Sequence, residues 1–158
     1  MRPLLALLLS CAVLTACQKR PVASADLRLP TLAAGEASPG ACPAERCLTV
    51  YVAPWCGICR VSTPLLKAVR ERLAARGVPV RFIVGKDSPE AVRAYAAEFG
   101  PETMLDLSAE VPLRGGVPNF TVLDSSGTVL KSVAGVPALH RPPFSQELLD
   151  GFTAFLGL

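Results

Sequence analysis

Histidine is almost absent from this chain of 158 residues, which contains only His140, and the charged residues form no cluster of one sign. The net charge at pH 7 is only +3, so nothing in the sequence indicates nucleic acid or acidic substrates as partners. A lone histidine in a proline-rich loop is typical of an ordinary surface residue and not of a metal ligand. The chain also lacks internal repeats, and its length leaves room for one ordinary domain with appendages.

A long hydrophobic run is missing as well. The apolar stretch over residues 3–13 follows the positive charge of Arg2 and has roughly ten residues, whereas a membrane-spanning helix needs about 20. It is followed by Leu14-Thr15-Ala16-Cys17, which resembles the bacterial lipobox, in which small residues precede a cysteine that is lipidated and becomes the mature N-terminus. The resemblance implies a signal peptide over residues 1–16, a lipid on Cys17 and a membrane-anchored protein that faces the periplasm. An ordinary cleaved signal and a retained anchor are the alternatives.

The membrane that holds this anchor is left open by the sequence. The residue after Cys17 is Gln18 and not aspartate, which by the same resemblance favours the outer membrane. The inner membrane is the alternative.

Residues 18–41 show no sustained hydrophobic periodicity and are rich in proline, glycine, alanine and serine. We therefore predict a lipidated N-terminus and flexible tether over residues 17–41 and a folded domain over residues 42–158. A short strand over residues 27–32 is the structural alternative.

The chemistry of the chain is concentrated in its cysteines. Cys56 and Cys59 lie between an apolar run over residues 48–52, which has the composition of a buried strand, and a long helical pattern. At the first turn of a helix, free N–H groups and the positive end of the helix dipole stabilise a thiolate, and the two-residue spacing lets the second sulfur close a disulfide with the first. This is the chemistry of dithiol–disulfide exchange, although a C-x-x-C pair alone is also compatible with zinc.

At these residues the chain resembles the thioredoxin superfamily. Trp55-Cys56-Gly57-Ile58-Cys59 follows the family's W-C-G-x-C active site, and Pro64 falls where the family carries the proline that kinks its active-site helix. Gly116-Val117-Pro118, ahead of an apolar strand, looks like the family's cis-proline loop. The resemblance implies an α/β fold, a thioredoxin-like three-layer α/β/α sandwich with a central mixed sheet. The long segment between the active site and Pro118 looks more like the TlpA-like branch, whose members are membrane-anchored, outward-facing thiol–disulfide proteins and often reductants.

The apolar patterns and turn signals predict the order strand, helix, strand, helix, short strand, strand, strand, helix. We expect strands over residues 48–53, 80–84, 103–107, 119–123 and 128–133, helices over 56–76, 88–99 and 145–156, and a short helical turn over 111–114.

The position of Cys56 nearer the helix start makes it the expected attacking thiolate, and Cys59 is then the resolving thiol. Trp55 is expected to shape the docking surface, with a place in the core as the alternative. If its peptide bond is cis, Pro118 would present the backbone of Val117 to an extended substrate segment, whereas a trans proline at a strand start is the alternative. The substrates are then protein thiols and disulfides, the electron donor is unidentified, and no cofactor beyond the redox-active disulfide is expected.

Two positions depart from the thioredoxin pattern. The buried acid that many thioredoxins carry falls on Val50, so no carboxylate is expected to take the proton of the resolving thiol. Ile58 replaces the proline of the common C-G-P-C, and because residues between the cysteines tune thiolate stability, the reduction potential is not transferable. We expect a reductant more than an oxidant.

Cys42 and Cys47 have no counterpart in this motif. Once Cys11 leaves with the signal and Cys17 is lipidated, four of the six cysteines remain, an even number in an oxidising compartment. Of the three pairings, Cys42–Cys47 with Cys56–Cys59 is the natural one. We expect Cys42–Cys47 to be a structural disulfide at the entry to the first strand, and a second redox pair that exchanges with Cys56–Cys59 is the alternative.

A copper- or zinc-binding module that uses the same cysteines is the alternative function. Four thiolates suit zinc, but the strand–cysteine–helix context and Pro64 argue against it. The C-x-x-x-C pattern typical of thioredoxin-fold copper chaperones is absent, and no threonine and arginine surround a lone peroxidatic cysteine.

Overall fold

The computed structural model describes residues 26–136 and 141–158. The predicted signal peptide, the predicted lipidation site Cys17 and the lone His140 lie outside the described residues. None of the described helices is long and apolar enough to span a bilayer.

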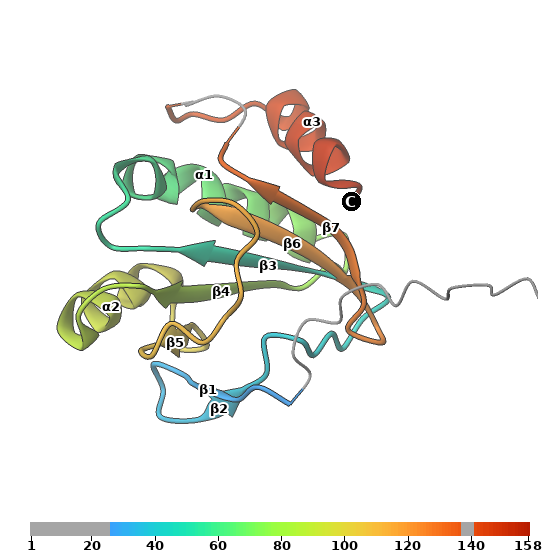
Figure 1. Ribbon diagram of the computed structural model, residues 1–158. Coiled ribbons are helices and arrows are strands. Elements are labelled where there is room, and N and C mark those ends of the chain that lie inside the picture. The colour runs from blue at the N-terminus through green and yellow to red at the C-terminus, as the bar shows by residue number, and fades with distance from the viewer. Residues whose placement is uncertain (1–25, 137–140) are drawn as a thin grey trace, which may run out of the picture.

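A five-stranded mixed sheet forms the centre of the domain, with the strand order β5-β4-β3-β6-β7 (Figure 1). Strands β3, β4 and β5 run parallel, while β6 pairs antiparallel with β3 and β7 antiparallel with β6. Their bounds are Arg46–Val52 for β3, Val80–Gly85 for β4, Met104–Asp106 for β5, Asn119–Asp124 for β6 and Val129–Ala134 for β7. The helices are α1 (Gly57–Ala74), α2 (Pro89–Ala96), which continues into the short 3-10 helix η1 (Ala97–Phe99), and α3 (Gln146–Leu156).

The predicted order of strands and helices is confirmed, with ends that shift by at most three residues. Ser88 and Ser145 cap α2 and α3 through their hydroxyls, as serine does at helix N-termini. The predicted helical turn over residues 111–114 is wrong, because the whole segment between β5 and β6 is irregular. Its backbone N–H groups at Glu110 and Val111 donate to the Asp106 carboxylate, and Pro112 has no N–H to continue a helix.

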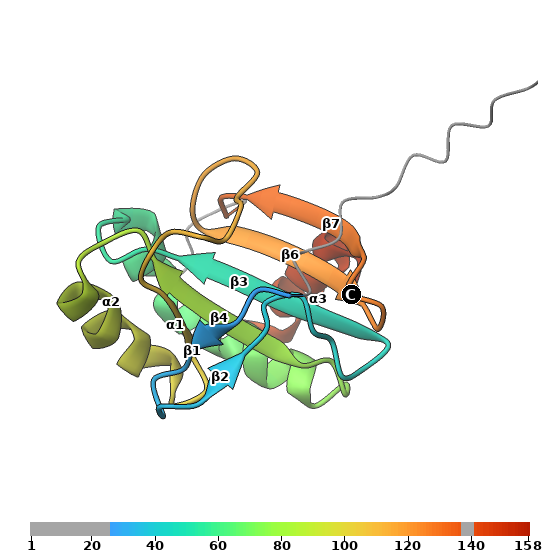
Figure 2. The same cartoon turned by 60° about the horizontal axis from the view of Figure 1, so that its bottom comes forward.

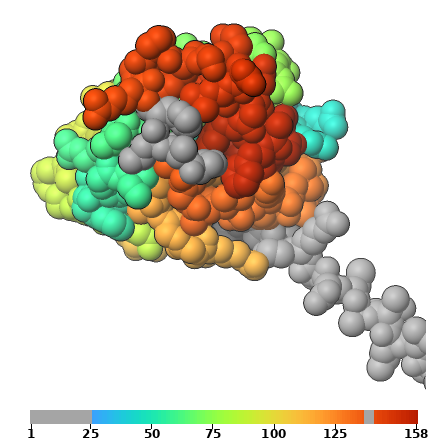
Figure 3. All heavy atoms as spheres, turned by 90° about the horizontal axis from the view of Figure 1, so that it is seen from above, coloured from blue at the N-terminus to red at the C-terminus, as the bar shows by residue number. Residues whose placement is uncertain are grey.

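All three helices pack on one face of the sheet. Both parallel crossovers, β3-α1-β4 and β4-α2-β5, step in the same direction across the sheet, so their right-handed connections place α1 and α2 on the same face. In Figure 3 α3, in red, lies across α1, whose green atoms emerge on either side of it. The main core joins the helices to alternate sheet residues such as Val50, Phe82 and Phe120.

Segments other than helices cover the opposite face of the sheet. Tyr51 and Ile83 point to this side and form a second cluster with Leu29 and Met104. Leu29 belongs to a small antiparallel hairpin of β1 (Leu29–Pro30) and β2 (Glu36–Ala37), which Figure 2 shows in front of the sheet with α1 and α3 behind. The central mixed sheet is as expected, but the layer on its second face consists of this hairpin and the irregular segment 107–118 in place of helices.

The hairpin corrects the predicted tether. Residues 29–41, assigned to the flexible tether over 17–41, are part of the folded domain, as the alternative of a short strand near residues 27–32 suggested. Leu29 is almost fully buried, Thr31 forms a β-bridge with Met104, and the guanidinium of Arg81 donates to the carbonyls of Ser38 and Pro39. Strands of two residues are too short to leave an alternating hydrophobic pattern, so the sequence offered the first of them only as an alternative and did not indicate the second.

Candidate active site

The Cys56–Cys59 disulfide lies where β3 turns into α1. The N–H of Cys56 donates to the carbonyl of Ala53 over 3.1 Å, which closes the turn after the strand. Cys56 is the N-cap of α1, and its Sγ accepts the backbone N–H of Cys59 over 3.1 Å. The first sulfur therefore occupies the position of a capping oxygen, where N–H groups and the helix dipole favour negative charge. The two cysteines are bonded to each other as expected, with their Cα atoms 5.2 Å apart.

Apolar side chains surround this disulfide on the outside of the protein. Cys56 and Cys59 are themselves 6% and 0% exposed, whereas Trp55, Ile58 and Val61 are 61%, 49% and 56% exposed. The exposure of Trp55 excludes the alternative that it is a core residue. Its indole N–H donates to the carbonyl of Lys86 over 2.8 Å, so the ring is held against the loop that follows β4.

The loop before β6 completes the site. The Val117–Pro118 peptide bond is cis, so the alternative of a trans proline does not apply. The carbonyl oxygen of Val117 lies 3.6 Å from the Sγ of Cys56. The side-chain amide of Asn119 donates to the carbonyl of Arg114 and ties the loop together. The structure thus brings Trp55, Cys56, Cys59, Val117 and Pro118 together from segments some sixty residues apart in the chain.

No carboxylate faces the disulfide from the sheet among the described residues. Val50, at the position where an acid is expected in many thioredoxins, is buried in the same cluster as both cysteines. Thr63 Oγ1 donates to the carbonyl of Cys59 over 3.2 Å and lies 2.9 Å from the hydroxyl of Tyr95. Burial raises the pKa of this tyrosine above its usual value, so it is neutral at physiological pH.

The buried acid of this protein lies on the other face of the sheet. Asp106 is fully buried, and its carboxylate accepts the Tyr51 hydroxyl over 2.8 Å. Burial and the neighbouring carboxylate both raise the pKa of Tyr51. A Cβ at Gly85 would overlap the Tyr51 hydroxyl and crowd Asp106, so the close approach of these two side chains requires glycine there. This pair could not be predicted from the sequence, because no local pattern links a tyrosine and an aspartate 55 residues apart.

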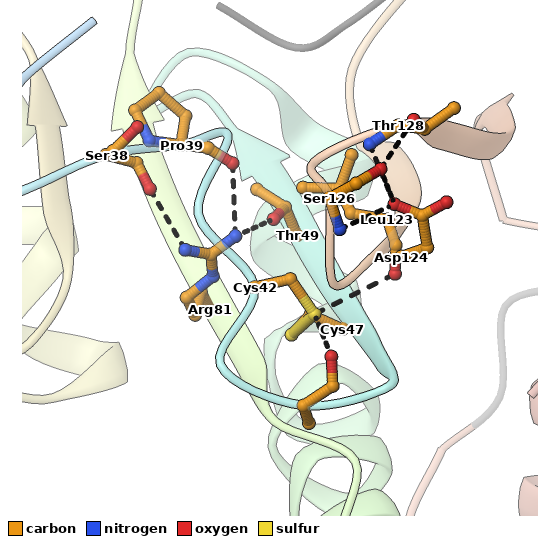
Figure 4. Close-up of a disulfide and its surroundings, with 11 residues drawn as sticks. Ser38, Pro39, Cys42, Cys47, Thr49, Arg81, Leu123, Asp124, Ser126 and Thr128 are labelled. Atoms are coloured by element: carbon orange, nitrogen blue, oxygen red, sulfur yellow. Dashed lines mark hydrogen bonds between the residues drawn. A yellow bond between two sulfur atoms is a disulfide. The ribbon is translucent and has the colours of Figure 1, made fainter. Parts of the chain in front are cut away.

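Cys42 and Cys47 form a second disulfide at the opposite end of β3 (Figure 4). It packs against Leu123, and the nearby guanidinium of Arg81 binds the backbone before it. Val52 follows Cys47 by five positions along the strand, which at about 3.3 Å per residue puts the two disulfides roughly 16 Å or more apart. Neither direct exchange between them nor a single zinc ion bound by all four sulfurs is compatible with this separation. The described residues contain no group of three or more histidine, cysteine, aspartate or glutamate side chains placed to hold a metal ion.

Comparisons with known proteins agree with this geometry at the level of the fold. No protein-family model and no curated protein sequence matches the chain. Among solved structures, the exposed lipoprotein thioredoxin Etrx1 of Streptococcus pneumoniae strain TIGR4 aligns with a TM-score of 0.62 and 15% identity over 83% of this chain and 97% of that chain. A secreted disulfide oxidoreductase of Mycobacterium tuberculosis homologous to E. coli DsbE aligns with a TM-score of 0.57 and 20% identity over 82% of this chain and 95% of that one.

A third structure, described as a thiol:disulfide interchange protein DsbE from Chlorobium tepidum, aligns with a TM-score of 0.57 and 21% identity over 87% of this chain and 98% of that chain. These three alignments cover between 82% and 87% of the chain. The chain therefore has the thioredoxin fold, as the resemblance of its motifs implied.

Proposed function

We propose that this protein is an extracytoplasmic thiol–disulfide oxidoreductase that exchanges the Cys56–Cys59 disulfide with protein thiols and acts as a reductant. The observation that carries the proposal is the place of the Cys56 sulfur. It caps α1, accepts the Cys59 N–H, and lies 3.6 Å from the carbonyl of Val117 in the loop before β6. A thiolate at a helix N-terminus is both a good nucleophile and a good leaving group near neutral pH.

Protein substrates fit this site better than small molecules. A cavity of about 550 Å³ on the second face of the sheet and one of about 400 Å³ beside α1 are both lined without cysteine. The disulfide instead lies beneath an open surface with three exposed apolar side chains, which suits docking of another protein. An extended substrate segment that pairs with the backbone of Val117 would bring its own sulfur next to Cys56.

The proposed reaction consists of two successive thiol–disulfide exchange steps. The Cys56 thiolate attacks a substrate disulfide, so that a mixed disulfide forms and the first substrate sulfur leaves and takes a proton. Cys59 then loses its proton, its thiolate attacks the Cys56 sulfur, and the second substrate sulfur leaves and is protonated. Two electrons pass from the cysteine pair to the substrate, and a separate thiol donor must return them.

The proposed location rests on the N-terminal sequence and on the compartment that suits disulfides. A lipid on Cys17 would anchor the protein, and residues 18–28 would connect it to the hairpin β1-β2, a shorter tether than the sequence alone suggested. A secreted protein and an exposed lipoprotein are among the similar structures, which supports an extracytoplasmic place. The membrane-bound electron donor of a reductant favours the inner membrane, whereas Gln18 favours the outer one.

The decisive experiment traps the intermediate and measures the potential. In the Cys59→Ala variant the mixed disulfide at Cys56 cannot resolve and should accumulate with a protein disulfide substrate, whereas Cys56→Ala should form none. A reduction potential of the Cys56–Cys59 pair near or below about −250 mV supports a reductant, and one near −120 mV marks an oxidant. Stoichiometric copper or zinc that blocks thiol labelling of the purified protein would instead support the metal-binding alternative.

A further inference from the structure

Ser62 carries a buried hydroxyl that has no hydrogen-bond partner among the described residues. The side chain is 2% exposed and lies on the buried face of α1, near the N-terminal end of the helix. Buried polar groups in folded proteins are nearly always hydrogen-bonded, and an exception calls for an explanation. The only other buried side-chain atom of this kind in the described part of the chain is Nε of Arg81, whose remaining guanidinium nitrogens are bonded.

Ser62 follows Cys59 in α1 by three residues, about one helical turn. Residues three apart on a helix have Cβ atoms about 5–6 Å from each other, and side chains lean toward the N-terminal turn. Ser62 therefore leans toward the turn that contains Cys59, which is fully buried on the same face of α1. The neighbouring hydroxyl of Thr63 is already engaged, because it donates to the Cys59 carbonyl and meets Tyr95.

The proposed exchange requires negative charge at Cys59. After the substrate binds to Cys56, Cys59 must become a thiolate within an apolar cluster, and burial without a partner disfavours that charge. The ionisable groups near Cys59 do little to stabilise its thiolate. On the sheet, Val50 lies in the same cluster as Cys59, and from α2 the hydroxyl of Tyr95 reaches Thr63. Arg60 is on the exposed side of α1, and the carboxylate of Asp106 binds Tyr51 on the other face of the sheet.

We infer that the Ser62 hydroxyl donates a hydrogen bond to the Cys59 sulfur when the disulfide is open, and that it thereby stabilises the thiolate that resolves the mixed disulfide. In the oxidised protein the sulfur is bonded to Cys56 and carries no charge, so the hydroxyl is left without a partner. This role rests on the proposed function, since only thiol–disulfide exchange needs the Cys59 thiolate. Ser62 would thus serve where thioredoxin-like proteins with a buried acid at the Val50 position have a carboxylate.

The test follows the ionisation of Cys59 in the reduced protein. In Ser62→Ala the pH midpoint of the Cys59 ¹³Cβ resonance should rise by about one unit, because a hydrogen bond to a charged group is lost. Resolution of the mixed disulfide at neutral pH should slow about threefold, since about tenfold less thiolate is partly offset by its greater nucleophilicity. Ser62→Thr, which keeps the hydroxyl, should restore the midpoint.

A matched control removes a buried helical hydroxyl elsewhere. Thr153 is fully buried on α3 and its hydroxyl donates to the Asp150 carbonyl, so Thr153→Val should lower the stability of both redox states and leave the Cys59 midpoint unchanged. The oxidised form of Ser62→Ala should be at least as stable as the wild type, because the change removes an orphan hydroxyl.

An unchanged Cys59 midpoint in Ser62→Ala, or a loss of stability in its oxidised form, would overturn the inference. Failure of the proposed function would look different. In that case the wild-type protein would show no thiol–disulfide exchange, even though the titration of Cys59 still depended on Ser62.

Discussion

Replacing Cys42 and Cys47 together by alanine distinguishes a structural disulfide from a second redox pair. The bond joins residues five apart in sequence, and closing so short a loop stabilises the folded state by about 2 kcal/mol in the chain-entropy view. The sulfurs also pack against Leu123 in a small buried cluster, so their removal leaves unfilled space. Together we expect a loss of about 3 kcal/mol in the free energy of unfolding, or roughly 10 °C in Tm.

Urea unfolding of the oxidised proteins measures this loss, and exchange with a protein disulfide, assayed well below Tm, measures the chemistry. Exchange by the double-alanine variant should stay within about twofold of wild type, because the two disulfides lie at opposite ends of β3, roughly 16 Å or more apart. The matched control is Cys56→Ala with Cys59→Ala, which should abolish exchange. A stability loss under about 1 kcal/mol, or a tenfold fall in exchange, would refute the reasoning.

Three further substitutions test other parts of the structure. Tyr51→Phe removes the hydroxyl that donates to Asp106 and should cost about 2 kcal/mol at pH 7 in urea unfolding. Because folding raises the pKa of Tyr51, the unfolded chain loses the tyrosine proton first, above about pH 10. The difference in unfolding free energy between wild type and Tyr51→Phe should therefore shrink as the pH rises further. A difference that stays constant to pH 11 contradicts this assignment. Arg81→Met removes the guanidinium that donates to the carbonyls of Ser38 and Pro39. Amide hydrogen exchange in residues 29–41 should therefore accelerate at least tenfold, while the protection of α3 stays unchanged. Trp55→Ala should slow exchange with a protein disulfide several-fold and leave exchange with a small disulfide nearly unaltered, since the exposed ring contributes docking surface; equal effects on both would contradict that role.

The sequence was sufficient wherever one local pattern determines the outcome. The strand before Cys56 is a continuous apolar run, and the helix after it repeats its buried residues every three or four positions, so both could be recognised with no knowledge of the rest of the chain. The short spacings of Cys42 to Cys47 and of Cys56 to Cys59 made their pairing the natural one. The loop at Pro118 was placed by resemblance, but its approach to the Cys56 sulfur became visible only in the structure.

The second face of the sheet could not be predicted, because long-range contacts define it. Leu29 is buried by Tyr51, Ile83 and Met104, which come from three different strands. No residue near Leu29 in the sequence indicates that it contacts them. The expected helical turn at residues 111–114 failed for a related reason. The N–H of Val111, and that of Glu110 just before the expected turn, bind the carboxylate of Asp106 at the end of β5. This competing acceptor comes close only in the folded chain.

The difference between the two disulfides does not lie in their exposure. Cys42 and Cys47 are 9% and 0% exposed, close to the values for the pair at α1. What differs is the surroundings of a freed sulfur. The Cys56 sulfur lies 3.6 Å from one carbonyl oxygen, that of Val117, but it also receives a backbone N–H at a helix N-terminus, which favours a thiolate. The Cys42 sulfur faces two carbonyl oxygens, those of Ala44 and Leu123, which disfavour a thiolate, and Figure 4 shows Leu123 beside the bond. We therefore expect reduction at α1 to yield a stabilised anion and reduction at the start of β3 to yield none, so that two bonds of similar burial would differ in reactivity.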